Sequence, residues 1–180
     1  RTDPHVAPRE MHQLHLYPYR KIIREVHPMG VMSSYNDWDG IPVSGSYYFL
    51  TELLREKYGF DGYVVSDSEA VEFVYSKHRV AQDMKGAVKQ GVEAGLNVKT
   101  NFTQPSDFVL PLRELVAEGS VSMQTLDRNV ADVLRVKFRL GLFDSPYVTD
   151  TKAADKIVAS SDTKEFEKQM GRESLVLLKN

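Results

Sequence analysis

A run of polar residues, Ser66 to Glu69, directly follows the short apolar segment Tyr63-Val64-Val65. Enzymes built on α/β barrels place catalytic carboxylates at the carboxyl ends of buried strands, and Asp67 stands at such a position. Asp residues that follow a strand also cap turns or helices through their side chains. The spacing therefore makes Asp67 a candidate catalytic carboxylate and leaves a purely structural role open.

Metal and phosphate chemistry have little support in the sequence. His12 and His15 are three residues apart in a predicted helix, but no carboxylate partner for a metal site is evident. No Gly-rich phosphate-binding loop follows a predicted strand. We therefore predict no metal site and no cofactor. Surface or interhelical roles are expected for the histidines, which are His5, His12, His15, His27 and His78.

The composition narrows the class of protein. The 180 residues are 42% hydrophobic and 27% charged, which predicts a packed globular interior. The net charge of −2, with acids and bases interspersed, does not indicate a nucleic-acid-binding surface. Without cysteine the chain forms no disulfide, and no apolar run approaches the ~18 residues of a membrane span. The first ten residues have neither a signal-peptide core nor an initiating Met, so we expect the natural start to lie elsewhere.

Hydrophobic periodicity and turn residues divide the chain into alternating helices and strands. Pro18 is expected to kink or split the first helix, and Ser122 is expected to cap the last long one. The predicted helices cover 8–26, 46–58, 80–94, 108–118 and 123–140, and the predicted strands cover 30–36, 62–66 and 96–99.

This alternation is typical of parallel strands joined by crossover helices. A barrel and a doubly wound sheet both fit the order, and the lack of a Gly-rich phosphate loop argues against a dinucleotide-binding sheet. Three strands cannot close a barrel that needs eight. The sequence therefore predicts an α/β fold that is part of a larger domain.

The composition and the hydrophobic periodicity of the chain change after residue 144. Residues 145–170 are polar and poorly periodic, as in a linker with a short helix, and 165–172 is predicted to be helical. The last residues, from Ser174 to Asn180, have the pattern of an apolar strand. A buried strand needs a partner, so we expect the chain to continue into a further domain.

Several ordered segments resemble the family 3 glycoside hydrolases, the β-glucosidase and β-xylosidase type. The nucleophile region of that family is similar to the succession GVMSSYNDWDGIPVSGSYYFLTELLREKYGFDGYVVSDSEAV. Its next barrel strand resembles AGLNV, and its final barrel helices and exit resemble LRELVAEGSVSMQTLDRNVADVLRVKFRLGLFDSPYV. The first strand of its second domain resembles GRESLVLLKN. The resemblance covers nearly the whole chain.

The resemblance implies a fold and an activity. Residues 1–144 would form the C-terminal half of a (β/α)8 TIM-like barrel, 145–170 the interdomain linker, and 171–180 the start of an α/β sandwich domain. The implied activity is that of an exo-acting retaining β-glycosidase, with β-glucosidase favoured and β-xylosidase as the alternative. The substrate would be a β-linked oligosaccharide or another β-glycoside, and the setting would be periplasmic or secreted.

The resemblance also assigns roles to residues. Asp67 matches the catalytic nucleophile, and Met32 and Tyr35 match the lining of the sugar subsite beside it. Ser68 stands where many members carry Trp, so an aromatic platform for the leaving group is missing at this position. The general acid/base belongs to the remainder of the parent polypeptide, so we expect the chain alone to be inactive and unstable.

Two nearby residues have further interpretations. Trp38 lies in a loop between Asp37 and Asp39, where it could contact substrate by stacking on a sugar ring or could pin the loop. Glu69 would lie roughly 6.5–7 Å from Asp67 if both were in one strand, which exceeds the roughly 5–5.5 Å of a retaining pair. We therefore expect Glu69 to have a supporting role.

Two other classes of function are alternatives. A carbohydrate-binding barrel fragment would bind sugar without turnover, and the intact Asp67 argues mildly against it. A barrel hydrolase with a metal-activated water would need His and Asp ligands at the strand ends, and the sequence shows no such set.

Overall fold

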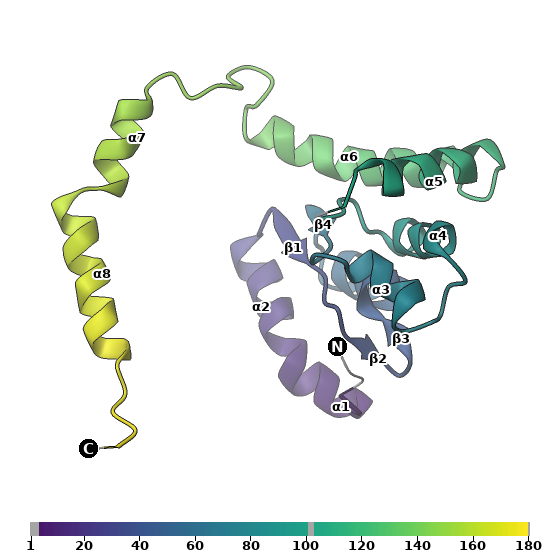
Figure 1. The fold of residues 1–180 in the computed structure, drawn as a ribbon, viewed down its shortest axis with the longest axis horizontal. Coiled ribbons are helices and arrows are strands. Elements are labelled where there is room, and N and C mark those ends of the chain that lie inside the picture. Colours follow the sequence, from purple (N-terminus) through teal and green to yellow (C-terminus); the bar gives the residue numbers. More distant parts are fainter. Residues whose placement is uncertain (1–3, 101–102, 180) are drawn as a thin grey trace. The chain divides into compact units, whose positions relative to one another are not determined.

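The computed structural model describes residues 4–100 and 103–179. The chain divides into two compact units, Arg1–Leu140 and Gly141–Asn180 (Figure 1). Helices and short strands alternate in the first unit, which holds the candidate catalytic residues. Its elements are, in order, α1 (Pro8–Glu10), η1 (Met11–His15), α2 (Tyr17–Val26), β1 (Gly30–Met32), β2 (Asp37–Trp38), β3 (Ile41–Pro42), η2 (Val43–Gly45), η3 (Tyr48–Lys57), β4 (Tyr63–Val65), α3 (Ala70–Ser76), α4 (Met84–Ala94), α5 (Ser106–Ala117) and α6 (Met123–Arg139).

Parallel segments form the centre of the first unit. β1 and β4 pair in parallel, with Met32 opposite Val65, and Val98 forms a further parallel bridge to Val65. The parallel arrangement predicted from the alternation is confirmed, although the paired stretches are shorter than predicted. Because parallel strands end at the same edge, the segments that follow β1, β4 and Val98 lie next to one another.

The loop after β1 folds into a small hairpin. β2 and β3 pair antiparallel, and between them Asp39 and Gly40 have positive φ angles of 53° and 76°. A two-residue hairpin turn can require positive φ at both positions, and an Asp-Gly pair adopts this conformation readily. The sequence pattern predicts only a loop here, because two-residue strands are too short to show alternation.

The helical stretch expected over 8–26 is divided into α1, η1 and α2. Pro18 lies in the first turn of α2, where its missing N–H leaves no helical hydrogen bond unmade. The wider π-type turn of η1 precedes it. The predicted interruption of the helix at Pro18 is therefore confirmed as a split, because α2 begins as a new helix at Tyr17.

The hydrophobic pattern does not predict α3. This helix has seven residues, and Ala70, Val71, Phe73 and Val74 are all buried. Its β-branched and aromatic residues have weak helix propensity, and the stretch covers only about two turns. Burial against the rest of the unit, rather than propensity, therefore stabilises α3.

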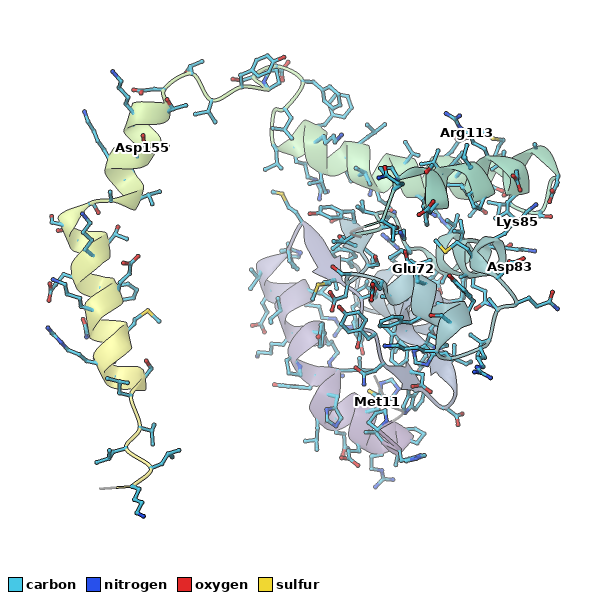
Figure 2. All side chains as sticks on the ribbon, viewed as in Figure 1. Met11, Glu72, Asp83, Lys85, Arg113 and Asp155 are labelled. Carbon is cyan, nitrogen blue, oxygen red and sulfur yellow. The ribbon has the colours of Figure 1, made fainter. Side chains whose placement is uncertain are left out.

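The next helix, α4, begins at Met84 rather than at Val80. Asp83 caps it, because its Oδ1 accepts the N–H of Gly86 at 2.8 Å (Figure 2). Gly95 follows the last helical residue with a φ of 105°, a conformation that favours glycine at a helix end.

Replacing Asp83 with Ala should lower the free energy of opening of α4 by about 1 kcal/mol, because the Gly86 N–H loses its side-chain acceptor. Amide hydrogen exchange of α4 peptides in the full-length protein would measure the change. Gln82→Ala alters the exposed neighbour and should change this free energy by less than about 0.5 kcal/mol. Equal effects of the two substitutions would show that Asp83 does not act as a cap.

The helices α5 and α6 pack beside α4 (Figure 1). Lys85 of α4 contacts Glu114 of α5 at 3.2 Å and Glu118, the residue after α5, at 2.6 Å (Figure 2). Its hydrogen bonds to these two carboxylates raise the pKa of its ammonium group. Ser122 caps α6 as predicted, with its Oγ accepting the N–H of Thr125 at 3.1 Å.

A largely buried polar cluster of Arg55, Asn97 and Asp132, called here the Arg55 cluster, joins α6 to β4. Arg55 contacts Asp132 at 3.0 Å and donates to Asn97 Oδ1 at 2.8 Å, and Asn97 donates to Asp132 Oδ2 at 3.1 Å. Asn97 Oδ1 also accepts the N–H of Val64 in β4 at 2.7 Å. Burial lowers the pKa of Arg55, and the Asp132 carboxylate opposes that effect. The cluster therefore links η3, β4 and α6 through charged and amide groups removed from solvent.

In the second unit, residues 151–174 form α7 (Thr151–Val158) and α8 (Ser161–Ser174). The helix predicted over 165–172 lies within α8. The strand predicted from Ser174 to Asn180 is wrong over the described residues 175–179, which form no strand and have exposed side chains. The physical reason is that a β-strand needs a neighbour for its backbone N–H and C=O groups, and this segment pairs with none among the described residues.

Candidate active site

Asp67 lies two residues beyond β4, at the edge where the parallel strands end. It is half-buried, and its Oδ1 accepts the N–H of Ser68 at 2.7 Å. Its carbonyl accepts the N–H of Ala70 at 3.1 Å, which closes the turn into α3. The N-cap position of α3 is Glu69, and no side chain caps that helix. The carboxylate of Asp67 is therefore not used as a helix cap, although it accepts a backbone N–H within its own turn.

Ser66 and Ser68 have different roles at this edge. Ser66 is buried; its N–H donates to Val98 O at 2.8 Å and its Oγ accepts the N–H of Thr100 at 3.0 Å. These bonds join the end of β4 to the neighbouring parallel segment. Ser68 is half-buried and orients Asp67 through its backbone N–H.

Glu69 occupies a left-handed backbone conformation with a φ of 61° and is exposed. The separation expected between Asp67 and Glu69 assumed one continuous strand, but β4 ends at Val65 and the chain then turns. The strand-based estimate of their separation therefore does not apply to these two residues. A left-handed non-glycine residue is uncommon and costs about 1–3 kcal/mol, and such residues cluster at functional turns.

Tyr35 and Met32 come from β1 and the loop that follows it. Tyr35 follows β1 at the same edge as Asp67, and its ring packs against Phe73 of α3 with a centroid distance of 5.5 Å. Met32, the last residue of β1, pairs with Val65 and is 61% exposed. Met32 therefore ends the strand next to β4, and Tyr35 lies in the loop that follows that strand.

Trp38 belongs to an aromatic cluster. Its indole Nε1 donates to Val6 O at 2.8 Å, and its ring stacks on Tyr48 at a centroid distance of 6.1 Å. The rings of Trp38 and Phe49 pack in a T-shaped arrangement at a centroid distance of 5.5 Å. These contacts support the loop-pinning alternative. A sugar contact by Trp38 stays a prediction, and it would have to use the part of the ring that these neighbours leave exposed.

An apolar cleft of about 290 Å³ lies beside β1 and does not include Asp67. Its lining includes Met11 and Val31, together with Met32 and Trp38, two of the residues predicted to bind substrate. Its lining is chiefly hydrophobic, whereas a sugar site needs hydrogen-bonding groups. We therefore assign no substrate to this cleft.

Two groups near the candidate site could not be placed from the sequence. Lys99 Nζ contacts Glu72 Oε1 at 2.7 Å, with side chains only 6% and 16% exposed, and this ion pair joins α3 to the segment after Val98. The side chain of His78 is only 9% exposed and contacts the loop after β1. A surface or interhelical role for His78 is therefore wrong.

The other described histidines give no metal site. His12 of η1 hydrogen-bonds to the Tyr48 hydroxyl of η3 at 2.9 Å, which is an interhelical role. Among residues 4–100 and 103–179, no group of three or more His, Cys, Asp or Glu side chains could hold a metal ion. In the same residues no helix is long and apolar enough to cross a membrane.

The family model described as the glycosyl hydrolase family 3 N-terminal domain matches residues 2–136, which is most of the chain. The chain belongs to glycosyl hydrolase family 3. The resemblance of its motifs to this family is thereby confirmed. The family match includes β1, β4 and the candidate residues Met32, Tyr35 and Asp67.

Curated relatives of this family 3 chain have two kinds of name. A putative β-xylosidase from Formosa agariphila is 34% identical over 175 residues, which cover 97% of this chain and 23% of that protein. A periplasmic β-glucosidase from Salmonella typhimurium is 33% identical over 154 residues, which cover 83% of this chain and 20% of that protein. The chain thus spans about a quarter or less of the length of these relatives.

Solved family 3 structures share the fold. A β-glucosidase from Erythrobacter marinus superposes with a TM-score of 0.88 at 34% identity, over 98% of this chain and 23% of that one. A β-glucosidase from Listeria innocua in complex with glucose gives a TM-score of 0.84 at 31% identity, over 97% and 23% of the two chains. The predicted α/β class is therefore confirmed.

Proposed function

We propose that this chain carries the catalytic nucleophile of an exo-acting retaining β-glycosidase, and that the nucleophile is Asp67. The main support is its position at the carboxyl end of β4, half-buried and not engaged as a helix cap. Barrel enzymes assemble their active sites at this edge of the strands. Membership of family 3 supports a glycosidase rather than a binding module.

The proposed reaction has two displacements. Asp67 attacks the anomeric carbon while the leaving oxygen takes a proton from a carboxylic acid outside this chain, about 5–5.5 Å away. Water, activated by the same second group, then attacks the covalent glycosyl-enzyme and releases Asp67. Each displacement inverts the anomeric carbon, so the released sugar keeps the β configuration.

We propose that the substrate sugar is a β-linked glucose or xylose at a non-reducing end. The relatives carry β-glucosidase and β-xylosidase names, so the two sugars are supported equally. Met32 and Tyr35 would line the sugar subsite beside Asp67. Because position 68 is Ser, no aromatic ring at this position would stack on the leaving group.

The proposed architecture has three parts. Residues 1–144 would form the C-terminal half of a (β/α)8 barrel, 145–170 a linker, and 171–180 the beginning of a second domain. The parallel order of β1, β4 and Val98, with helices between them, supports this arrangement. The remainder of the polypeptide would supply the other strands, the acid/base and further sugar-binding groups.

Product stereochemistry tests the proposed reaction. We expect the full-length protein to hydrolyse aryl β-glucosides or aryl β-xylosides, and proton NMR should show the β-anomer of the sugar before mutarotation. The ratio of kcat/KM for the two glycosides would identify the sugar. The α-anomer as first product would contradict retention. Sugar binding with no hydrolysis of either glycoside would overturn the enzymatic role.

A further inference from the structure

The proposed reaction does not use His78, a largely buried histidine that contacts the loop carrying Tyr35. His78 follows α3, two residues after Ser76, and its N–H donates to Phe73 O at 2.9 Å. Its side chain is only 9% exposed. A buried imidazole needs hydrogen-bond partners, and those of His78 come from a different part of the chain.

The imidazole contacts the loop that follows β1. Its Nε2 lies 2.9 Å from the carbonyl oxygen of Tyr35, and its Nδ1 lies 3.7 Å from Oδ1 of Asp37. Because a carbonyl oxygen only accepts hydrogen bonds, Nε2 carries the proton and donates. One ring therefore holds the backbone of Tyr35 and faces the first residue of the β2–β3 hairpin.

The ring of Tyr35 contacts the same segment of the chain, which includes α3 and His78. It packs against Phe73 of α3 with a centroid distance of 5.5 Å and an interplanar angle of 38°. The N-terminal end of α3 follows the turn that contains Asp67. The segment that places Asp67 thus also holds Tyr35, through Phe73 at its ring and His78 at its carbonyl.

We infer that His78 is a positioning residue, which fixes Tyr35 relative to Asp67 without itself touching the sugar. The inference rests on the proposed function, in which Asp67 attacks the sugar and Tyr35 lines its subsite. Loss of the Nε2 hydrogen bond leaves the Tyr35 carbonyl without this donor and frees the loop to shift. A displacement of about 1 Å in a substrate-positioning group can reduce the rate about 100-fold.

A double-mutant cycle in the full-length protein tests this role. His78→Ala should lower kcat/KM for an aryl β-glycoside about 10–100-fold when Tyr35 is present. In the Tyr35→Ala background the same substitution should lower it by less than about 3-fold, because His78 acts through Tyr35. His78→Gln offers an amide donor to the Tyr35 carbonyl and should recover much of the activity.

Val74→Ala is the control for a general loss of stability, since Val74 is a buried residue of α3 outside the site. Its kcat/KM should equal that of the wild type below the unfolding temperature. Equal factors for His78→Ala in both backgrounds, or no loss in either, would overturn the positioning role while an active wild type upholds the proposed function. A wild type that hydrolyses neither glycoside would overturn the proposed function and this role together.

Discussion

Asp67→Gly in the full-length protein should lower kcat by about 10⁴-fold or more, because no other group can form the covalent intermediate. The half-buried carboxylate makes one hydrogen bond within its own turn, so the fold should tolerate the change. Steady-state kinetics on an activated aryl β-glycoside would measure the loss, and circular dichroism would confirm that the protein stays folded.

Adding azide to the Asp67→Gly protein tests the role of this carboxylate more specifically. A small anion can enter the space that the Asp67 carboxylate occupied and attack the anomeric carbon from the same side. Azide should therefore restore turnover of the Asp67→Gly protein and give an α-glycosyl azide, since only one inversion occurs. Glu69→Gln is the matched control, because Glu69 is an exposed carboxylate two residues away, and its activity should fall less than about 10-fold. A β-glycosyl azide, or full activity of Asp67→Gly without azide, would contradict the assignment.

The second large effect is expected in the Arg55 cluster. Asp132→Ala removes the carboxylate 3.0 Å from the Arg55 guanidinium, whose side chain is only 14% exposed. Removing one partner of a buried ion pair leaves the other charge uncompensated and costs about 3–5 kcal/mol. Amide hydrogen exchange of the β4 and α6 peptides in the full-length protein should show a loss of that size in the free energy of opening.

Two further variants distinguish the loss of this ion pair from a general loss of stability of α6. Asp127→Ala removes an exposed carboxylate from the same helix and should change the free energy of opening by less than about 0.5 kcal/mol. The double substitution Arg55→Met with Asp132→Leu removes both charges and should be less destabilising than Asp132→Ala alone. If the double variant lost as much free energy of opening as the single substitutions Arg55→Met and Asp132→Leu together, the two side chains would not be coupled.

Local sequence patterns predicted the parts of the fold that depend on neighbouring residues. The change from Tyr63-Val64-Val65 to Ser66-Asp67 marked the end of a buried strand, and the structure has β4 there. Ser122 carried the signal of a helix cap and accepts a hydrogen bond from the helix backbone. The alternation of helices and strands predicted parallel pairing, which β1 and β4 show.

Features that depend on distant partners were not predictable. Tyr35 and His78 are separated by 43 positions, and no local pattern indicates that one would bind the carbonyl of the other. The helix α3 is held by burial of its apolar face and gives a weak local signal. The terminal apolar segment has the composition of a strand, but a strand also needs a neighbour to pair with. The chemistry of this site therefore depends on contacts that the sequence does not show.

The central claim is that Asp67 forms the glycosyl-enzyme. The most direct measurement is to inactivate the full-length protein with 2-fluoro glucosyl and 2-fluoro xylosyl donors, digest it, and analyse the peptides by mass spectrometry. We expect a 2-fluoro sugar adduct on Asp67, and the faster-reacting donor would show whether glucose or xylose is the substrate sugar. Inactivation with the adduct on another residue would contradict this claim.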